Sequence, residues 1–73
     1  MLVLSTGEKI SFHRKKHNLT QEELAYKLNV SRQTIYKWES GTAFPNINHL
    51  RMLVEILSID LNYLIKEDSE RRD

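Results

Sequence analysis

The sequence contains no cysteine, a single proline and two glycines among its 73 residues. The absence of cysteine excludes a disulfide framework and a thiolate metal site, and it fits the reducing cytoplasm. The longest apolar runs, such as residues 1–4 and 52–54, are far too short to span a bilayer, so no membrane contact is expected. No basic segment precedes the first run, which argues against a signal peptide. The length suits one domain with a small core.

Residues suited to catalysis or metal binding are also scarce. No serine has a plausible histidine–acid arrangement and no glycine-rich phosphate loop is present, so we predict no catalytic residue and no enzyme. His13 and His17 are four positions apart, which would place both on one face of a helix. Because neither a cysteine nor a third well-placed ligand accompanies them, we expect no metal site. No cofactor or small-molecule ligand is evident either.

The formal net charge is only +1, but the charges are unevenly distributed along the chain. Between Glu8 and Lys37 there are seven lysines and arginines against three glutamates. Between Glu55 and Asp73 there are six acids against three basic residues. The first of these regions suits a polyanionic partner. The alternative is two solvated faces that differ by chance, and charge alone does not decide between them.

What the sequence does contain is a series of helix start and stop signals, without β alternation or internal repeats. The first two starts are capping boxes, in which Ser5 pairs with Glu8 and Thr20 with Glu23. Starts are expected at Ser5, Thr20, Ser31, Asn46 and Asp60, and ends near His17, Asn29, Gly41, Leu57 and Ile65. The pattern predicts an all-α fold, a compact five-helix bundle in residues 1–66. The charged tail at 67–73 is expected to be frayed.

The link between the second and third of these helices is short. Residues 28–31 leave room for a turn of three or four residues, so the two amphipathic helices must cross steeply, as in a helix-turn-helix unit. On the third helix, Ile35 and Trp38 share a face that predicts contact with the core. The opposite side carries long or aromatic polar side chains without a carboxylate: Arg32, Gln33, Tyr36 and Lys37.

These four side chains suit the major groove of DNA. The groove accepts one α-helix and presents base edges that arginine, lysine and glutamine bind, and a tyrosine there reaches a phosphate or a thymine methyl group. Gln21 begins the preceding helix, where free backbone N–H groups attract a phosphate. We therefore interpret the third helix as a reader of bases and Gln21 as a phosphate contact. The alternatives are that Arg32, Gln33 and Lys37 are ordinary solvated surface and that Tyr36 only covers a neighbouring side chain.

The segment TQEELAYKLNVSRQTIYKWESGTAFP, residues 20–45, closely resembles the helix-turn-helix of phage-repressor-like (Cro/C1, or XRE) transcription regulators. The resemblance extends over about residues 8–65 and implies a lambda-repressor-like domain that usually binds operator DNA as a homodimer. Asn18 and Asn29 stand where the family often has glycine, and asparagine tolerates the same backbone conformation. His13 and Phe12 depart from the family pattern on the first helix.

Roles for single residues follow from the resemblance, position by position. It implies base contacts by Arg32, Gln33, Tyr36 and Lys37, and phosphate contacts by Gln21, Ser31, Ser40 and Thr42. It also implies a partly buried ion pair between Arg14 and Glu39, which would link the first helix to the third.

The sequence thus predicts a cytoplasmic, sequence-specific DNA-binding transcriptional regulator. We expect a repressor that binds double-stranded DNA as a homodimer on a near-palindromic operator. The dimer hypothesis rests on apolar Ile59, Leu61, Leu64 and Ile65 near an otherwise charged C-terminus. The rival is a protein-interaction module, such as an antitoxin or regulatory partner, that would use the apolar last helix and the segment 2–4. Steep weakening of binding with salt would distinguish a DNA-binding protein from this rival.

Overall fold

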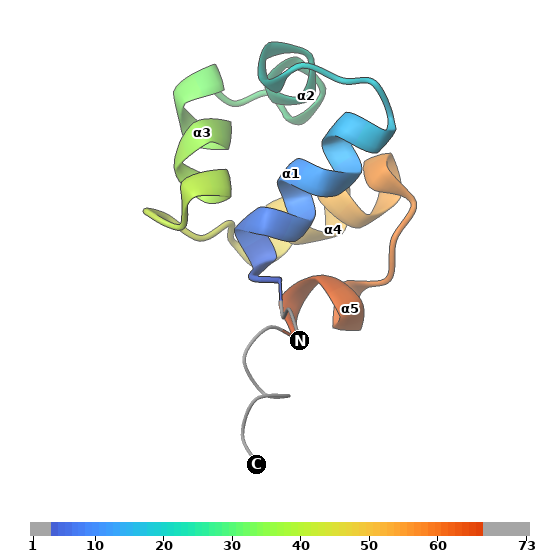
Figure 1. Cartoon of the computed structure of the whole chain (residues 1–73). Helices are drawn as coiled ribbons and strands as arrows, with labels where there is room; N and C mark the ends of the chain where they lie inside the picture. The colour runs from blue at the N-terminus through green and yellow to red at the C-terminus, as the bar shows by residue number, and fades with distance from the viewer. Residues whose placement is uncertain (1–3, 67–73) are drawn as a thin grey trace.

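The computed structural model describes residues 4–66, which form five α-helices and no strand (Figure 1). In chain order the helices are α1 (Thr6–Lys16), α2 (Gln21–Leu28), α3 (Arg32–Ser40), α4 (Ile47–Leu57) and α5 (Leu61–Ile65). The predicted all-α, five-helix fold is confirmed. Within this described part of the chain, no helix has the length and apolar character needed to cross a membrane. Leu2, Val3 and the charged tail at 67–73 lie outside the described residues.

The helix boundaries follow the local signals in the sequence. All five expected N-cap side chains accept a hydrogen bond from a backbone N–H in the first turn of their helix, and both predicted capping boxes are complete. Asn18, Asn29 and Gly41 have a positive φ, as expected. Ser58, just after α4, also has a positive φ of 56°. The sequence did not indicate this conformation, because a serine rarely adopts it.

The core draws apolar side chains from every helix. Its buried members are Ile10, Leu24, Ala25, Leu28, Ile35, Trp38, Leu50, Leu53, Leu57 and Leu64. Two apolar side chains of the helices lie outside this core: Ile47 is 54% exposed and Ile65 is 43% exposed. Ile47 is the first residue of α4 and Ile65 the last of α5, where little of the neighbouring helices remains to cover a side chain.

α1 approaches α3 so closely that only a glycine fits at the crossing. A Cβ atom on Gly7 would lie 2.3 Å from the carbonyl oxygen of Trp38 and 2.8 Å from that of Glu39. Both atoms belong to the backbone and cannot move aside by a change of rotamer. Glycine therefore lets α1 pack directly behind the last turn of α3.

α5 is attached to α1 by side chains that bind its C-terminal carbonyl groups. Thr6 Oγ1 donates to the carbonyl oxygen of Leu64 at 2.8 Å, and Lys9 Nζ donates to those of Tyr63 at 2.6 Å and of Lys66. Both donor residues are buried, and Lys9 Nζ also lies 4.5 Å from the centre of the Tyr63 ring. The final carbonyl groups of a helix lack partners and carry partial negative charge, so they satisfy the buried ammonium. We call Thr6 and Lys9 the α5 clamp.

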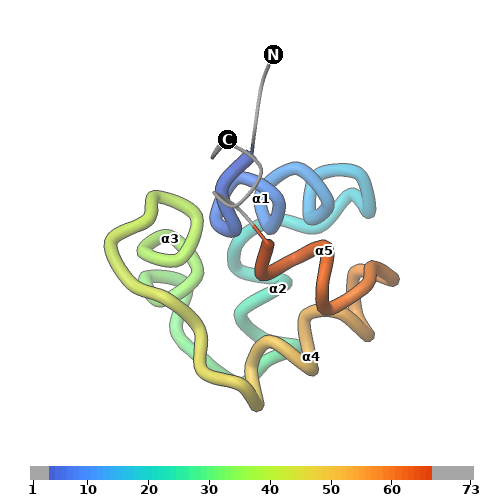
Figure 2. Tube along the Cα trace, turned by 90° about the horizontal axis from the view of Figure 1, so that it is seen from below, coloured from blue at the N-terminus to red at the C-terminus, as the bar shows by residue number. Residues whose placement is uncertain are grey.

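α1 consequently packs against three other helices, α3, α4 and α5. Figure 1 shows it between α3 and α5, and Figure 2, seen from below, shows it along one edge of the molecule. The side of α3 that faces away from α1 is left for contacts outside the domain.

Candidate nucleic-acid interface

α2 and α3 form the predicted helix-turn-helix. Asn29 takes the left-handed conformation with φ 59°, and the N–H of Val30 donates to the carbonyl oxygen of Ala25 at 3.0 Å. Ser31 then begins α3, because its Oγ accepts from the N–H of Thr34 at 3.1 Å. The turn is complete within three residues, so α3 stands at the edge of the molecule beside α2 (Figure 1).

The face of α3 that points away from the core carries the four predicted base readers. Their side chains are exposed, whereas Ile35 is 0% and Trp38 4% exposed on the opposite face. The exposed residues are Arg32, Gln33, Tyr36 and Lys37. At 3.6 residues per turn, positions i, i+1, i+4 and i+5 lie within less than half of the helix circumference, so they form one strip. Tyr36 is 57% exposed, so its ring stands largely in solvent.

The other small polar residues of the expected site lie at the two ends of this strip. Ser31 Oγ lies at the N-terminal end and is also 3.0 Å from Thr34 Oγ1. At the C-terminal end, Ser40 Oγ donates to the carbonyl oxygen of Lys37 at 3.2 Å and lies 3.0 Å from Thr42 Oγ1. All three expected phosphate contacts, Ser31, Ser40 and Thr42, are exposed.

The fourth expected phosphate contact, Gln21, belongs to a network that the sequence predicted only in part. Arg14 and Glu39 form the expected ion pair through two bonds, Nε to Oε2 at 2.6 Å and Nη2 to Oε1 at 3.1 Å. Their side chains are only 10% and 8% exposed. Gln21 Nε2 donates to the same Glu39 Oε1 at 3.0 Å. This bond joins two residues that are 18 positions apart in sequence, one on α2 and one on α3, so no local sequence pattern indicates it.

The three histidines have separate structural partners. His13 Nε2 lies 3.0 Å from the hydroxyl of Tyr63, and His17 Nε2 lies 2.8 Å from the carbonyl oxygen of Leu57. The ring of His49 packs against that of Trp38 at 5.2 Å between centroids. Within residues 4–66, no group of three or more potential ligands is arranged to hold a metal ion. Burial lowers the pKa of the His13 imidazole below its usual 6.5, and the neighbouring charges of Lys16 and His17 act in the same direction.

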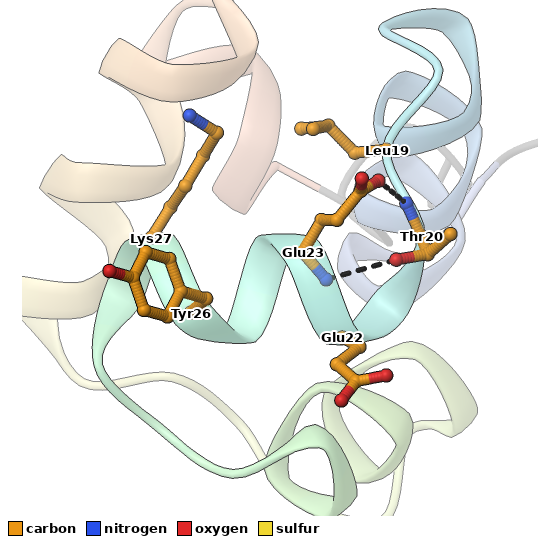
Figure 3. A pocket seen from close by; sticks show the side chains of 6 residues that line it. All are labelled: Leu19, Thr20, Glu22, Glu23, Tyr26 and Lys27. Carbon is orange, nitrogen blue, oxygen red and sulfur yellow. Dashed lines mark hydrogen bonds between the residues drawn. The ribbon is translucent and has the colours of Figure 1, made fainter.

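A shallow open groove of about 750 Å³ runs along α2, and none of its lining residues belongs to α3 (Figure 3). Its lining residues are Leu19, Thr20, Glu22, Glu23, Tyr26 and Lys27. Glu23 is already engaged in the capping box with Thr20, and Glu22 and Lys27 point away from each other in Figure 3. Tyr26 is 87% exposed. The groove therefore has no set of polar groups that converge on one point.

The apolar residues expected at a dimer interface are mostly used inside the domain. Leu64 is fully buried, and Ile59 and Leu61 pack partly buried against the core. Of the four, Ile65 alone is exposed. Within the described residues, Leu64 is therefore unavailable for contact with a second copy, Ile59 and Leu61 are partly accessible, and Ile65 is exposed.

Comparison with known proteins agrees with this geometry. The model of a helix-turn-helix family matches residues 12–64. The HTH-type transcriptional activator BcrR of Enterococcus faecalis is 43% identical over 59 residues, which are 81% of this chain and 29% of BcrR. The uncharacterized HTH-type transcriptional regulator MJ0272 of Methanocaldococcus jannaschii is 40% identical over 63 residues, 85% of this chain and 96% of that protein. The chain thus spans less than a third of the first relative and nearly all of the second.

A solved structure shares the arrangement of the helices. The P22 c2 repressor, crystallised in complex with a synthetic operator, has a TM-score of 0.82 and 33% sequence identity to this chain. The likeness covers 86% of this chain and 96% of the repressor chain. With the family model, the two relatives and this shared fold in agreement, the chain belongs to the Cro/C1-type helix-turn-helix family of transcriptional regulators.

Proposed function

We propose that the chain is a non-enzymatic, sequence-specific DNA-binding regulator whose α3 lies in the major groove of double-stranded DNA. The observation that carries the proposal is the division of α3 into two faces. Ile35 and Trp38 fix one face in the core, and four long polar side chains stand exposed on the other. A helix supported in this way enters the groove without rearrangement, which is the geometry of the helix-turn-helix class. The P22 c2 repressor, of the same fold, was solved in complex with an operator.

The residues divide into two groups under this proposal. Base edges are read by the strip of Arg32, Gln33, Tyr36 and Lys37. Their side chains carry hydrogen-bond donors that suit the acceptor atoms of guanine and adenine in the major groove. Phosphates are bound at the ends of α3 and at the start of α2 by Ser31, Ser40, Thr42 and Gln21. Phosphate contacts fix the register of the domain on the duplex, and base contacts give its preference.

We further propose a cytoplasmic repressor that acts as a homodimer on a near-palindromic operator. A two-fold dimer would place two α3 helices about 34 Å apart, one turn of DNA. The exposed apolar side chain of Ile65, beside the 38% exposed Tyr63 on α5, supports an interface at that helix. α5 and α3 lie apart from each other in both views, so such an interface leaves the reading strip free (Figures 1 and 2).

Selection from a random duplex pool tests the proposal, followed by titration of the recovered duplex at two salt concentrations. We expect an enriched near-palindrome with half-sites one turn apart. We also expect affinity that falls steeply with salt, because bound phosphates release counterions. Salt-sensitive binding without an enriched sequence would overturn the claim of sequence specificity. Failure to bind any duplex at low salt would overturn DNA binding itself and favour a protein partner.

A further inference from the structure

We infer that Glu39 is a positioning residue for the phosphate contact of Gln21, which makes the Arg14–Glu39 pair part of the DNA-binding apparatus as well as a support of the fold. The inference rests on the proposed function, because it assigns a device to the phosphate contact proposed there. It concerns the arrangement of one side-chain amide, before any DNA is bound.

The geometry around the Glu39 carboxylate carries the inference. Oε1 accepts two hydrogen bonds, from Arg14 Nη2 at 3.1 Å and from Gln21 Nε2 at 3.0 Å, and Oε2 accepts from Arg14 Nε at 2.6 Å. The Gln21 amide nitrogen carries two N–H groups, and one of them is used in this bond. The second N–H remains for an acceptor outside the domain. Gln21 is half-buried, so that this acceptor can approach from the solvent side.

The charge of the network also suits a phosphate. An unpaired carboxylate at this position would repel a DNA backbone, but the guanidinium of Arg14 neutralises it through two bonds. Arg14 Nη1 further donates to the carbonyl oxygen of Leu19 at 2.8 Å, in the loop that leads to α2. The Arg14–Glu39 pair therefore holds the loop before α2 through Arg14 and the Gln21 amide through Glu39.

The chain holds an internal comparison for this idea, because it has two glutamines, Gln21 and Gln33. Gln33 lies exposed on α3, and its side chain makes no hydrogen bond within residues 4–66. A side chain held in its bound orientation loses less freedom on binding than a free one. We therefore expect a fixed Gln21 amide that binds any duplex, and a mobile Gln33 amide that orders on the correct bases.

A double-mutant cycle in DNA binding tests the inference. The background is Arg14→Met/Glu39→Leu, which removes both charges together so that neither is left buried alone. The probe is the duplex recovered by selection, and circular dichroism establishes that each variant is folded. We expect Gln21→Ala to weaken binding about tenfold in the wild-type chain and less than about twofold in the background that lacks Glu39. Lys37→Ala is the matched control, and its loss should be the same in both backgrounds.

The outcomes separate the inference from the proposed function. An equal loss for Gln21→Ala in both backgrounds would overturn the role of Glu39 while leaving DNA binding intact. No loss in the wild-type chain would do the same, because Gln21 would then contact no phosphate. A wild-type chain that binds no duplex would overturn the proposed function itself.

A second measurement uses only the unmodified protein, so it tests the inference even if the Arg14→Met/Glu39→Leu background does not fold. Nuclear magnetic resonance relaxation of the two glutamine side-chain amides reports their order in the free state. We expect the Gln21 amide to be markedly more rigid than that of Gln33. Equal mobility of the two amides would overturn the inference.

Discussion

At the scale of single residues, Gly7 shows how a contact distant in sequence reverses a local rule. Replacing a helical glycine by alanine ordinarily stabilises a helix by about 0.5–1 kcal/mol. In α1 the added Cβ would meet the carbonyl oxygen of Trp38 at 2.3 Å, so the backbone must shift.

We therefore predict that Gly7→Ala lowers the free energy of unfolding by about 1–3 kcal/mol, the usual cost of overpacking. Urea denaturation measures the change. Lys15→Ala, at an exposed position of the same helix, is the control and should alter stability by less than about 0.5 kcal/mol. A Gly7→Ala variant that is more stable than the wild type would contradict the close crossing of α1 and α3.

The division between reading and positioning is also a prediction about single residues. Gln33→Ala should relax base preference at one or two operator positions, each by about 1–3 kcal/mol. Gln21→Ala should weaken all duplexes about equally, since a phosphate contact carries no sequence information. Binding to a library of single-base operator variants measures both. If the two variants give the same pattern across the library, the assignment of roles is wrong.

The residues that sequence reasoning missed share a physical cause. The N-caps and the left-handed Asn18, Asn29 and Gly41 were predictable because their signals lie within four residues of the feature. Gly7 and Lys9 act through contacts to backbone atoms tens of positions away, and nothing near them in the chain indicates those contacts. The approach of Gln21 to Glu39 belongs to the same class. The features of the candidate site that depend on neighbouring residues could thus be predicted from the sequence, and the contacts between residues distant in sequence could not.

At the scale of elements, α5 depends on the α5 clamp, because five residues give it little hydrogen bonding of its own. Thr6→Val keeps the shape of the side chain but leaves the buried carbonyl oxygen of Leu64 without its donor. We predict a loss of about 1–3 kcal/mol in the free energy of unfolding. The substitution should increase the rate of amide hydrogen exchange, relative to the wild type, more in α5 than in α2.

Thr42→Val is the matched control for this change, since the Thr42 side chain is exposed and its hydroxyl bonds only to that of the nearby Ser40 within the described residues. It should leave exchange at α5 unaltered. If hydrogen exchange in Thr6→Val became faster by the same factor in all helices, the α5 clamp would stabilise the whole domain and not α5 in particular.

His13 gives the contact between α1 and α5 a dependence on pH. Its folded-state pKa is lowered, chiefly by burial, so the unfolded chain takes up a proton at a higher pH than the folded domain does. The stability that this histidine contributes is complete above pH 6.5, the usual value, and is lost as the pH falls through and below it. Urea midpoints at pH 7.5 and 5.5 measure the loss. His13→Gln, which does not titrate, should show a smaller difference between the two pH values.

At the scale of the whole molecule, the exposed apolar side chains allow a test of assembly. Ile65 on α5 and Ile47 on α4 are similarly exposed, at 43% and 54%, and both lie at helix ends. If α5 forms the dimer interface, Ile65→Arg should raise the dissociation constant of the dimer at least about tenfold, as expected for a central contact. Ile47→Arg should not change it. Sedimentation velocity with and without operator duplex measures both, and a strictly monomeric wild-type chain on the operator would remove the dimer from the proposal.

The fold as a whole was more predictable than its surfaces. Helix number, order and the short turn between α2 and α3 follow from caps, breakers and apolar spacing, which act along the chain. The exposure of Ile47, Leu64 and Ile65 depends on how far a neighbouring helix extends over each side chain. The spacing of apolar residues in the sequence does not contain that information. The assembly of two copies depends on these exposed side chains, so it is harder to predict from the sequence than the fold of one copy.

The α5 clamp has a consequence for the time course of folding. The bond between Thr6 and Leu64 joins positions 58 apart, and those of Lys9 join positions 54 and 57 apart. Contacts of such long range cost the most chain entropy to close, so we expect them to form after the contacts between neighbouring helices. An interaction absent from the transition state slows unfolding and leaves the folding rate nearly unchanged. We therefore expect Thr6 and Lys9, at the start of α1, to prolong the lifetime of each native molecule once it has formed.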